Sequence, residues 1–393
     1  MENYILINVG IKNTKEANLW LRAAWSMIRK EFGRCSWFYM PNIKTEQKLI
    51  HLGKFQVEKN IEGSIEVYIT YKQRGGISNV IFQNYTSDLS SLKKCLNSVK
   101  SKHRIELAEQ EFSVKIDLPF PILNYIGECV RIQPINKTQS EIVIKIQCYD
   151  TIDGQFIAKQ KYNIIIDLLA SIFWRKISIS DINREKETVK LKYPSNTYSD
   201  IFEFSIFDEY YVKDNIYFLP KKLFRIINEI VTNDEYNFNL SNLIKAVRVY
   251  HSALKVKYLE RLRDIDLSIY EITVTHYMSV LEILSMEEGD SKHCKECHQE
   301  VYSISKRVRF FLNKVFPNED HRKKSLNALY NSRSEFLHSG KYINNDTYVN
   351  AIIPQLSNGT ELLEYQNFHD NGFIKHSIGM CIEFYIKNLI NPS

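Results

Sequence analysis

Hydrophobic and polar residues alternate in short runs through the first part of the chain, which is the period of strands with one buried face. These runs lie at 3–9, 65–71, 112–116, 129–132 and 142–146. The polar segment 74–76 separates 65–71 from another apolar run at 80–82 and predicts a β-hairpin. Residues 15–32 instead have the three-to-four spacing of an amphipathic helix, for which Asn13 is a suitable N-cap.

A second group of apolar runs follows these strands. The polar segment 150–154 predicts a turn, the isoleucine-rich segment 162–166 predicts a strand, and 168–174 predicts a short closing helix. Further helices are expected at 87–99 and 221–231.

From residue 239 onward the pattern becomes helical. Apolar residues recur every three or four positions in 240–255, 265–285, 301–316, 324–338 and 375–390. We therefore predict an α+β protein. Its parts would be a mixed, strand-rich N-terminal domain with helices (1–177), a connecting segment (178–236) and an all-α C-terminal bundle (237–393).

One of these predicted helices carries an arginine where a buried leucine would be expected. The apolar stripe of 324–338 includes Arg333. An unpaired charge on a buried stripe is costly, so Arg333 must pair with another side chain or face a cleft. Gly340 predicts the helix end, which puts His338 in the last turn, where the helix dipole favours the imidazolium form.

An arginine and a histidine together supply what RNA cleavage without a metal requires. The ribose 2′-hydroxyl must lose a proton, the leaving 5′-oxygen must gain one, and the charge on the phosphorane must be stabilised. Histidine transfers protons near neutral pH, and arginine binds phosphate oxygens in a bidentate manner. The alternative is a histidine at a helix end and an arginine that reaches solvent, and spacing alone favours this alternative.

The residues around this pair extend the pattern. Tyr330-x-x-Arg333-Ser334-x-x-Leu337-His338-x-Gly340, preceded by several helices and followed by one, resembles the HEPN superfamily, specifically its ApeA-like branch. The resemblance covers about residues 237–393. It implies a small, usually dimeric helical bundle in which the R-x4-6-H motifs of two subunits form one ribonuclease site. It also implies a role as a toxin or antiphage effector.

The resemblance extends to supporting residues. Members of the branch carry a Leu-Glu pair on an earlier helix, and here that glutamate is Glu282. Glu282 would pair with Arg333 across the bundle; the alternative is an exposed glutamate on the far face. Asn331 and Ser334 are further candidates for a supporting role, whereas Tyr330 is expected in the core. Ser334 differs from the Asn, Asp or His common in the superfamily but is similar to the ApeA-like branch.

Two basic clusters lie close to the motif in sequence. They contribute Lys306, Arg307, Arg309, Arg322, Lys323 and Lys324. Around an active site these side chains would bind RNA phosphates. The alternative is that they form solvated helix surfaces.

A stretch rich in cysteine and histidine precedes these clusters. His293, Cys294, Cys297 and His298 are ligand types that zinc prefers, although a second Cys-x-x-Cys is missing. The Cys-x-x-Cys-His spacing is also that of c-type haem attachment, which requires export and is disfavoured by the lack of a signal peptide. A structural zinc ion and a solvated loop are the two alternatives, and catalysis is expected to need no cofactor.

Composition sets few limits on function. The 393 residues carry a formal net charge of +6, which is too small to indicate nucleic-acid binding by itself. Seven cysteines, an odd number, favour reduced thiols. The N-terminus lacks a signal-peptide pattern and no apolar run reaches membrane-spanning length, so we expect a cytoplasmic protein without a membrane partner. The lack of P-loop, dinucleotide, serine-hydrolase and zinc-protease motifs disfavours those classes.

Residues and resemblance together predict a metal-independent endoribonuclease of defence or toxin type, which cleaves RNA as a homodimer through Arg333 and His338. The N-terminal domain would sense a phage-derived trigger or a regulatory protein, or hold the nuclease inactive. Two alternatives stay open. One is a non-catalytic helical module that binds RNA or a partner protein, and the other is a HEPN partner of a nucleotidyltransferase.

Overall fold

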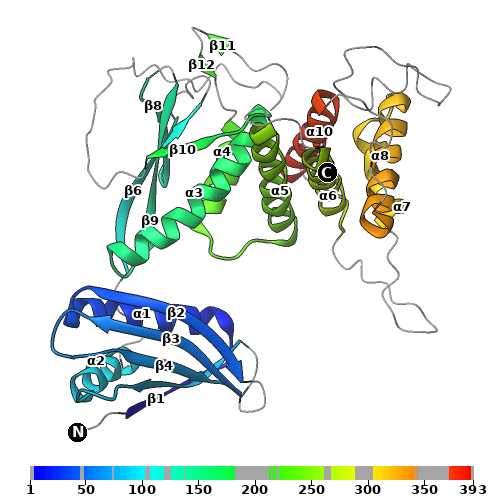
Figure 1. Cartoon of the computed structure of the whole chain (residues 1–393). Helices are drawn as coiled ribbons and strands as arrows, with labels where there is room; N and C mark the ends of the chain where they lie inside the picture. Colours follow the sequence, from blue (N-terminus) through cyan, green and yellow to red (C-terminus); the bar gives the residue numbers. More distant parts are fainter. Residues whose placement is uncertain are drawn as a thin grey trace. The chain divides into compact units, whose positions relative to one another are not determined.

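The computed structural model combines helices with antiparallel sheets, which confirms the α+β class (Figure 1). It describes residues 4–44, 48–72, 75–101, 107–118, 125–136, 138–181, 212–213, 216–217, 221–260, 267–287, 304–340, 343 and 371–390. Contacts divide the chain into two compact units. The first comprises Met1–Phe112 and Lys145–Ala158, and the second comprises Ser113–Ile144 and Lys159–Ser393. The three domains expected from the sequence stay a prediction.

The first unit contains a five-stranded antiparallel sheet and two helices. Its strand order is β1-β5-β4-β3-β2. The strands are β1 (Tyr4–Ile11), β2 (Cys35–Lys44), β3 (Leu49–Val57), β4 (Ile65–Thr70) and β5 (Ile77–Gln83), and the helices are α1 (Thr14–Phe32) and α2 (Ser90–Ser101). The predicted hairpin of β4 and β5 and the predicted α1 are therefore present. Asn13 caps α1, because its side chain accepts a hydrogen bond from the Glu16 backbone N–H at 2.9 Å.

The core of this unit lies on one face of the sheet. Every second residue of β4 is buried, and these residues pack in one cluster with apolar residues of α1 and α2. No element was predicted over β2 and β3. The edge strand β2 shows no alternation of apolar and polar residues in the sequence, because three successive aromatic residues, Trp37, Phe38 and Tyr39, are 39%, 58% and 65% exposed. It also contains Pro41, which is typical of an edge strand.

Two bidentate ion pairs join α1 to the start of α3 (Thr151–Phe173) within the first unit. Arg22 Nε and Nη2 donate to Asp153 at 2.7 and 3.0 Å. Arg29 Nε and Nη2 donate to Asp150 at 2.8 and 3.0 Å. Asp150 also caps α3, because its Oδ1 accepts a hydrogen bond from the Asp153 backbone N–H at 2.8 Å.

The prediction for residues 150–174 is wrong. Instead of a turn, a strand and a short helix, the structure has the single 23-residue helix α3. The aspartates that suggested a turn cap this helix. Ile164, Ile165 and Ile166 are all buried, so the helix has no polar face here and its apolar run looks like a strand.

The second unit contains a sheet with the strand order β10-β6-β9-β8-β7. These strands are β6 (Ala108–Asp117), β7 (Tyr125–Ile126), β8 (Val130–Pro134), β9 (Gln139–Cys148) and β10 (Ser178–Asp181). The short pair β11 (Val212–Lys213) and β12 (Ile216–Tyr217) and the helix α4 (Lys221–Thr232) follow. The predicted strands at 112–116, 129–132 and 142–146 coincide with β6, β8 and β9.

All regular elements that the structure describes after residue 237 are helices, and the HEPN-type bundle stays a prediction. They are α5 (Phe238–Glu260), α6 (Leu267–Leu284), α7 (Ile304–Val315), α8 (Asp320–Ser339) and α10 (Asn371–Ile390). The helix α6 is central, since it contacts α5, α7, α8 and α10. Among the helices that the structure describes, none is long and apolar enough to cross a membrane.

A buried histidine joins α3 to α5 inside this unit. His251 is 0% exposed, and its Nδ1 lies 2.7 Å from Asp167 Oδ1. The backbone N–H of Ile177 donates to His251 Nε2 at 3.3 Å. Because Nε2 accepts, Nδ1 is the nitrogen that donates to the carboxylate.

The Arg29–Asp150 pair predicts an acid-sensitive contribution to stability. Burial raises the pKa of Asp150, but hydrogen bonds from Arg29 and the Asp153 backbone outweigh it, so the pKa is lowered overall. A carboxyl of this kind stabilises the fold above its unfolded-state pKa of about 4, and the contribution is lost as the pH falls through the lower folded-state pKa. We expect Asp150→Asn to be less stable at pH 7 and to lose less stability on acidification.

Urea denaturation at pH 7 and pH 3 measures both effects. Glu109→Gln, which alters an exposed carboxylate of β6, is the matched control and should follow the unmodified chain. An Asp150→Asn variant with unchanged stability at both pH values would contradict the prediction.

Candidate active site

Arg333 lies on the apolar stripe of α8 and is paired there. Its Nη1 donates to Glu282 Oε1 at 2.8 Å, and its Nη2 lies 3.4 Å from Glu282 Oε2. The same Nη2 lies 3.3 Å from the Ser279 hydroxyl. The side chains of Arg333 and Glu282 are only 15% and 19% exposed. The ion pair that was predicted between α6 and α8 is therefore present, and it explains how a charge occupies this stripe.

Tyr330 completes this group of side chains. It is buried, as expected, and its hydroxyl donates to Glu282 Oε1 at 2.8 Å. Burial, together with the hydrogen bond to Glu282, raises the pKa of Tyr330 to about 12. We call Ser279, Glu282, Tyr330 and Arg333 the Arg333 cluster. In this cluster one carboxylate oxygen of Glu282 accepts from both the phenol and the guanidinium, which fixes the orientation of Arg333.

His338 lies in the last turn of α8 and is exposed. Gly340 ends the helix in the left-handed conformation, with φ 70°, and its N–H donates to the Phe336 carbonyl at 2.9 Å. His338 lies five positions after Arg333 on the helix, which corresponds to about 7.5 Å along the axis and about 140° around it. Within one chain, then, Arg333 faces α6 while His338 points in a different direction.

The other candidates near the motif have different surroundings. Asn331 is exposed and Ser334 is half-buried on α8. Both are close to Arg333 in the chain, and their supporting role stays a prediction.

The predicted RNA-binding residues divide into two groups. Arg322 and Lys323 have contacts within the chain. The Arg322 guanidinium lies 2.7 Å from Glu319 and packs over Phe316, and Lys323 pairs with Asp320 at 2.7 Å. Lys306, Arg309 and Lys324 are exposed, whereas Arg307 is half-buried and also interacts within the chain.

The candidate zinc ligands His293, Cys294, Cys297 and His298 lie outside the described residues. In the part of the chain that the structure describes, no three side chains of metal-binding type are grouped together. The zinc site stays a prediction, which elemental analysis of the purified protein would test.

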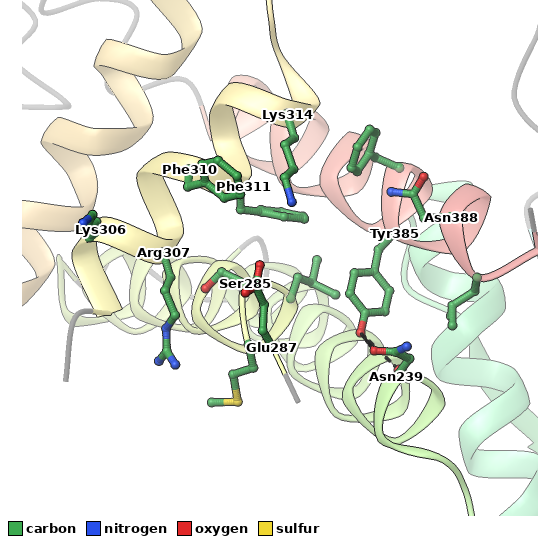
Figure 2. Close-up of a pocket in the computed structure, with 14 residues that line it drawn as sticks. Asn239, Ser285, Glu287, Lys306, Arg307, Phe310, Phe311, Lys314, Tyr385 and Asn388 are labelled. Atoms are coloured by element: carbon green, nitrogen blue, oxygen red, sulfur yellow. Dashed lines mark hydrogen bonds between the residues drawn. The ribbon is translucent and has the colours of Figure 1, made fainter. Parts of the chain in front are cut away.

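A cavity of about 560 Å³ in the second unit was not predicted. The helix α7 contributes Lys306 to its lining and, on one face, Arg307, Phe310, Phe311 and Lys314 (Figure 2). Their spacing of i, i+3, i+4 and i+7 was visible in the sequence and marks one helix face. What the sequence could not show is that parts of α6, α10 and α5 close around this face.

Comparisons of this chain with protein-family models, with curated proteins and with solved structures found no match.

The geometry of the Arg333 cluster predicts strong energetic coupling between α6 and α8. Glu282→Ala leaves the largely buried Arg333 without its carboxylate, so we expect the free energy of unfolding to fall by about 1–3 kcal/mol. In a double-mutant cycle with Arg333→Ala, the double variant should lose less than the sum of the single variants. Urea denaturation measures all three, and strictly additive losses would show that the contact is not coupled.

Proposed function

We propose that this protein is a metal-independent endoribonuclease with a HEPN-type helical bundle and a composite site formed by two subunits. The observation that carries the proposal is the Arg333–Glu282 pair, which holds a guanidinium on the same helix that presents His338 at its exposed end. A guanidinium suits a phosphate, and an exposed imidazole suits proton transfer.

The offset between the two side chains supports a second subunit. Cleavage needs a base and an acid on opposite sides of the phosphorus, and one chain supplies a single histidine of the motif. An isologous interface at the end of α8 would bring two His338 side chains and two Arg333 side chains together. Leu337, beside His338, is 51% exposed, and an interface at this position would bury it.

In this mechanism, one His338 takes the proton of the ribose 2′-hydroxyl, and the oxygen attacks the phosphorus. The other His338 gives a proton to the leaving 5′-oxygen, and Arg333 stabilises the charge on the phosphorane. The products are a 2′,3′-cyclic phosphate and a 5′-hydroxyl. The contacts to Glu282 and Ser279 occupy three of the five guanidinium N–H donors at most. Of the two others, Nε is buried, which leaves one Nη1 N–H for a phosphate oxygen.

A second candidate function is a non-catalytic helical module that binds RNA or a protein. It is favoured by the low exposure of Arg333, whose side chain is 15% exposed, since a purely structural ion pair would have the same geometry. The two candidates differ in whether the Arg333 and His338 side chains are needed for RNA cleavage.

We expect His338→Ala and Arg333→Ala each to lower the rate of RNA cleavage by at least about 100-fold, the contribution typical of a general acid–base group. Cellular toxicity should be lost in parallel, activity should persist in EDTA, and the products should carry 2′,3′-cyclic phosphate ends. Matched controls are His321→Ala, an exposed histidine at the start of α8, and Arg225→Ala, an exposed arginine of α4. Wild-type cleavage by both active-site variants would refute the proposal.

A mixing experiment tests the composite site itself. When wild-type and His338→Ala subunits are co-expressed in varied ratio, a mixed dimer keeps a single His338 and lacks either the acid or the base. Cleavage should therefore fall with the square of the wild-type fraction. A linear fall would show that each subunit carries a complete site.

A further inference from the structure

The helix α7 presents a face that the proposed active site does not use. Arg307, Phe310, Phe311 and Lys314 follow one another along this face, with a cation at each end and two phenylalanines between them. They line the cavity of about 560 Å³ together with residues of α5, α10 and the end of α6. This volume lies within the range of small-molecule sites. Among the described residues, none that lines the cavity belongs to the Arg333 cluster.

One wall of the cavity is aromatic. Phe311 packs edge to face against Phe384 of α10, with ring centroids 6.1 Å apart. The Tyr385 hydroxyl is held by the Asn239 backbone carbonyl at 3.3 Å, and Figure 2 shows this pair inside the lining. Phe310, in contrast, is 55% exposed. A planar apolar group stacked on Phe310 would remove that ring from water.

The charged groups of the lining are mostly basic. The lining contains three cations, Lys306, Arg307 and Lys314, and one acidic residue, Glu287. The Lys314 ammonium lies 4.3 Å from the centroid of the Phe310 ring, so cation and exposed ring are adjacent. The excess of positive charge favours an anionic ligand.

The amide side chains of Asn239 and Asn388 add hydrogen-bond donors and acceptors to the same lining. An inorganic phosphate would use the cations but not the rings, and an acidic peptide would not require an exposed flat ring. A nucleotide uses all three features: the base stacks, its edges bond to amides, and its phosphate binds the cations.

We infer that this cavity binds a nucleotide, with its base against Phe310 and its phosphate at Lys314 or Arg307. Each cation is one helical turn, about 5 Å, from the phenylalanine pair, so a phosphate attached to a stacked base reaches either. The nucleotide could be free or part of a single-stranded RNA. If the nucleotide is part of an RNA, the inference rests on the proposed function and extends it. A binding measurement tests the inference, whereas a cleavage measurement does not.

The test is calorimetric titration of the full chain with adenosine 5′-monophosphate, with ribose 5-phosphate and adenosine as partial ligands. The nucleotide should bind at least about tenfold more tightly than either fragment. Phe310→Ala should weaken nucleotide binding at least about fivefold, the lower end of what base stacking contributes. Lys314→Ala should weaken it by a similar factor. Both side chains are exposed, so folding is expected to survive, and circular dichroism checks it.

Arg225→Ala is the matched control, because Arg225 is an exposed cation of α4 outside the cavity lining. A second arm titrates single-stranded hexaribonucleotide into the His338→Ala chain, with and without Phe310→Ala. RNA binding that weakens with Phe310→Ala identifies RNA as the source, and mononucleotide binding alone identifies a free nucleotide. The inference is overturned if neither ligand binds, if ribose 5-phosphate binds as tightly as the nucleotide, or if both cavity variants bind unchanged.

The two proposals can fail separately. If the His338→Ala chain binds the nucleotide but the wild-type chain does not cleave RNA, only the proposed nuclease activity is refuted. If the wild-type chain cleaves RNA, His338→Ala does not, and no nucleotide binds, only the proposed nucleotide site is refuted.

Discussion

The ion pair between Arg333 and Glu282 is the interaction on which the arrangement of α6 and α8 depends. Burying a charge is expensive, and a buried ion pair usually stabilises a protein no more than apolar side chains of similar size. Stability alone therefore gives no reason for an arginine on the apolar stripe of α8. A chemical need for a guanidinium at this place does give one, and it is the physical basis for treating the Arg333 cluster as a site rather than as a packing detail.

The central position of α6 allows this ion pair to fix the orientation of α8. Since α6 also packs against α5, α7 and α10, Glu282 is part of a helix held on several sides. The carboxylate in turn holds Tyr330 and Arg333, both within 2.8 Å of its Oε1. The orientation of α8 is thus constrained near its C-terminal end. Because His338 lies in the last turn of the same helix, its position is constrained as well. A dimer interface built there would join two helix ends that are already positioned.

A polar face makes a helix easier to predict from the sequence. The helices α1 and α7 have one, and each was predicted close to its observed bounds. In α3, the isoleucines 164–166 are all buried, so the sequence shows no helical alternation of apolar and polar residues there. Asp150 is typical of a turn in the sequence, but in the structure it caps the helix. The cost of a buried charge required a partner for Arg333, and the Leu-Glu pair implied by the resemblance identified that partner as Glu282. The cavity could not be predicted, because it depends on how four helices meet.

The first turn of α7 lies between the two proposed sites. Ser305 lies near Tyr330 of the Arg333 cluster, while the next two residues, Lys306 and Arg307, line the cavity. Since α7 packs against both α6 and α8, the cavity proposed to bind a nucleotide and the guanidinium proposed to bind the scissile phosphate lie on neighbouring helices.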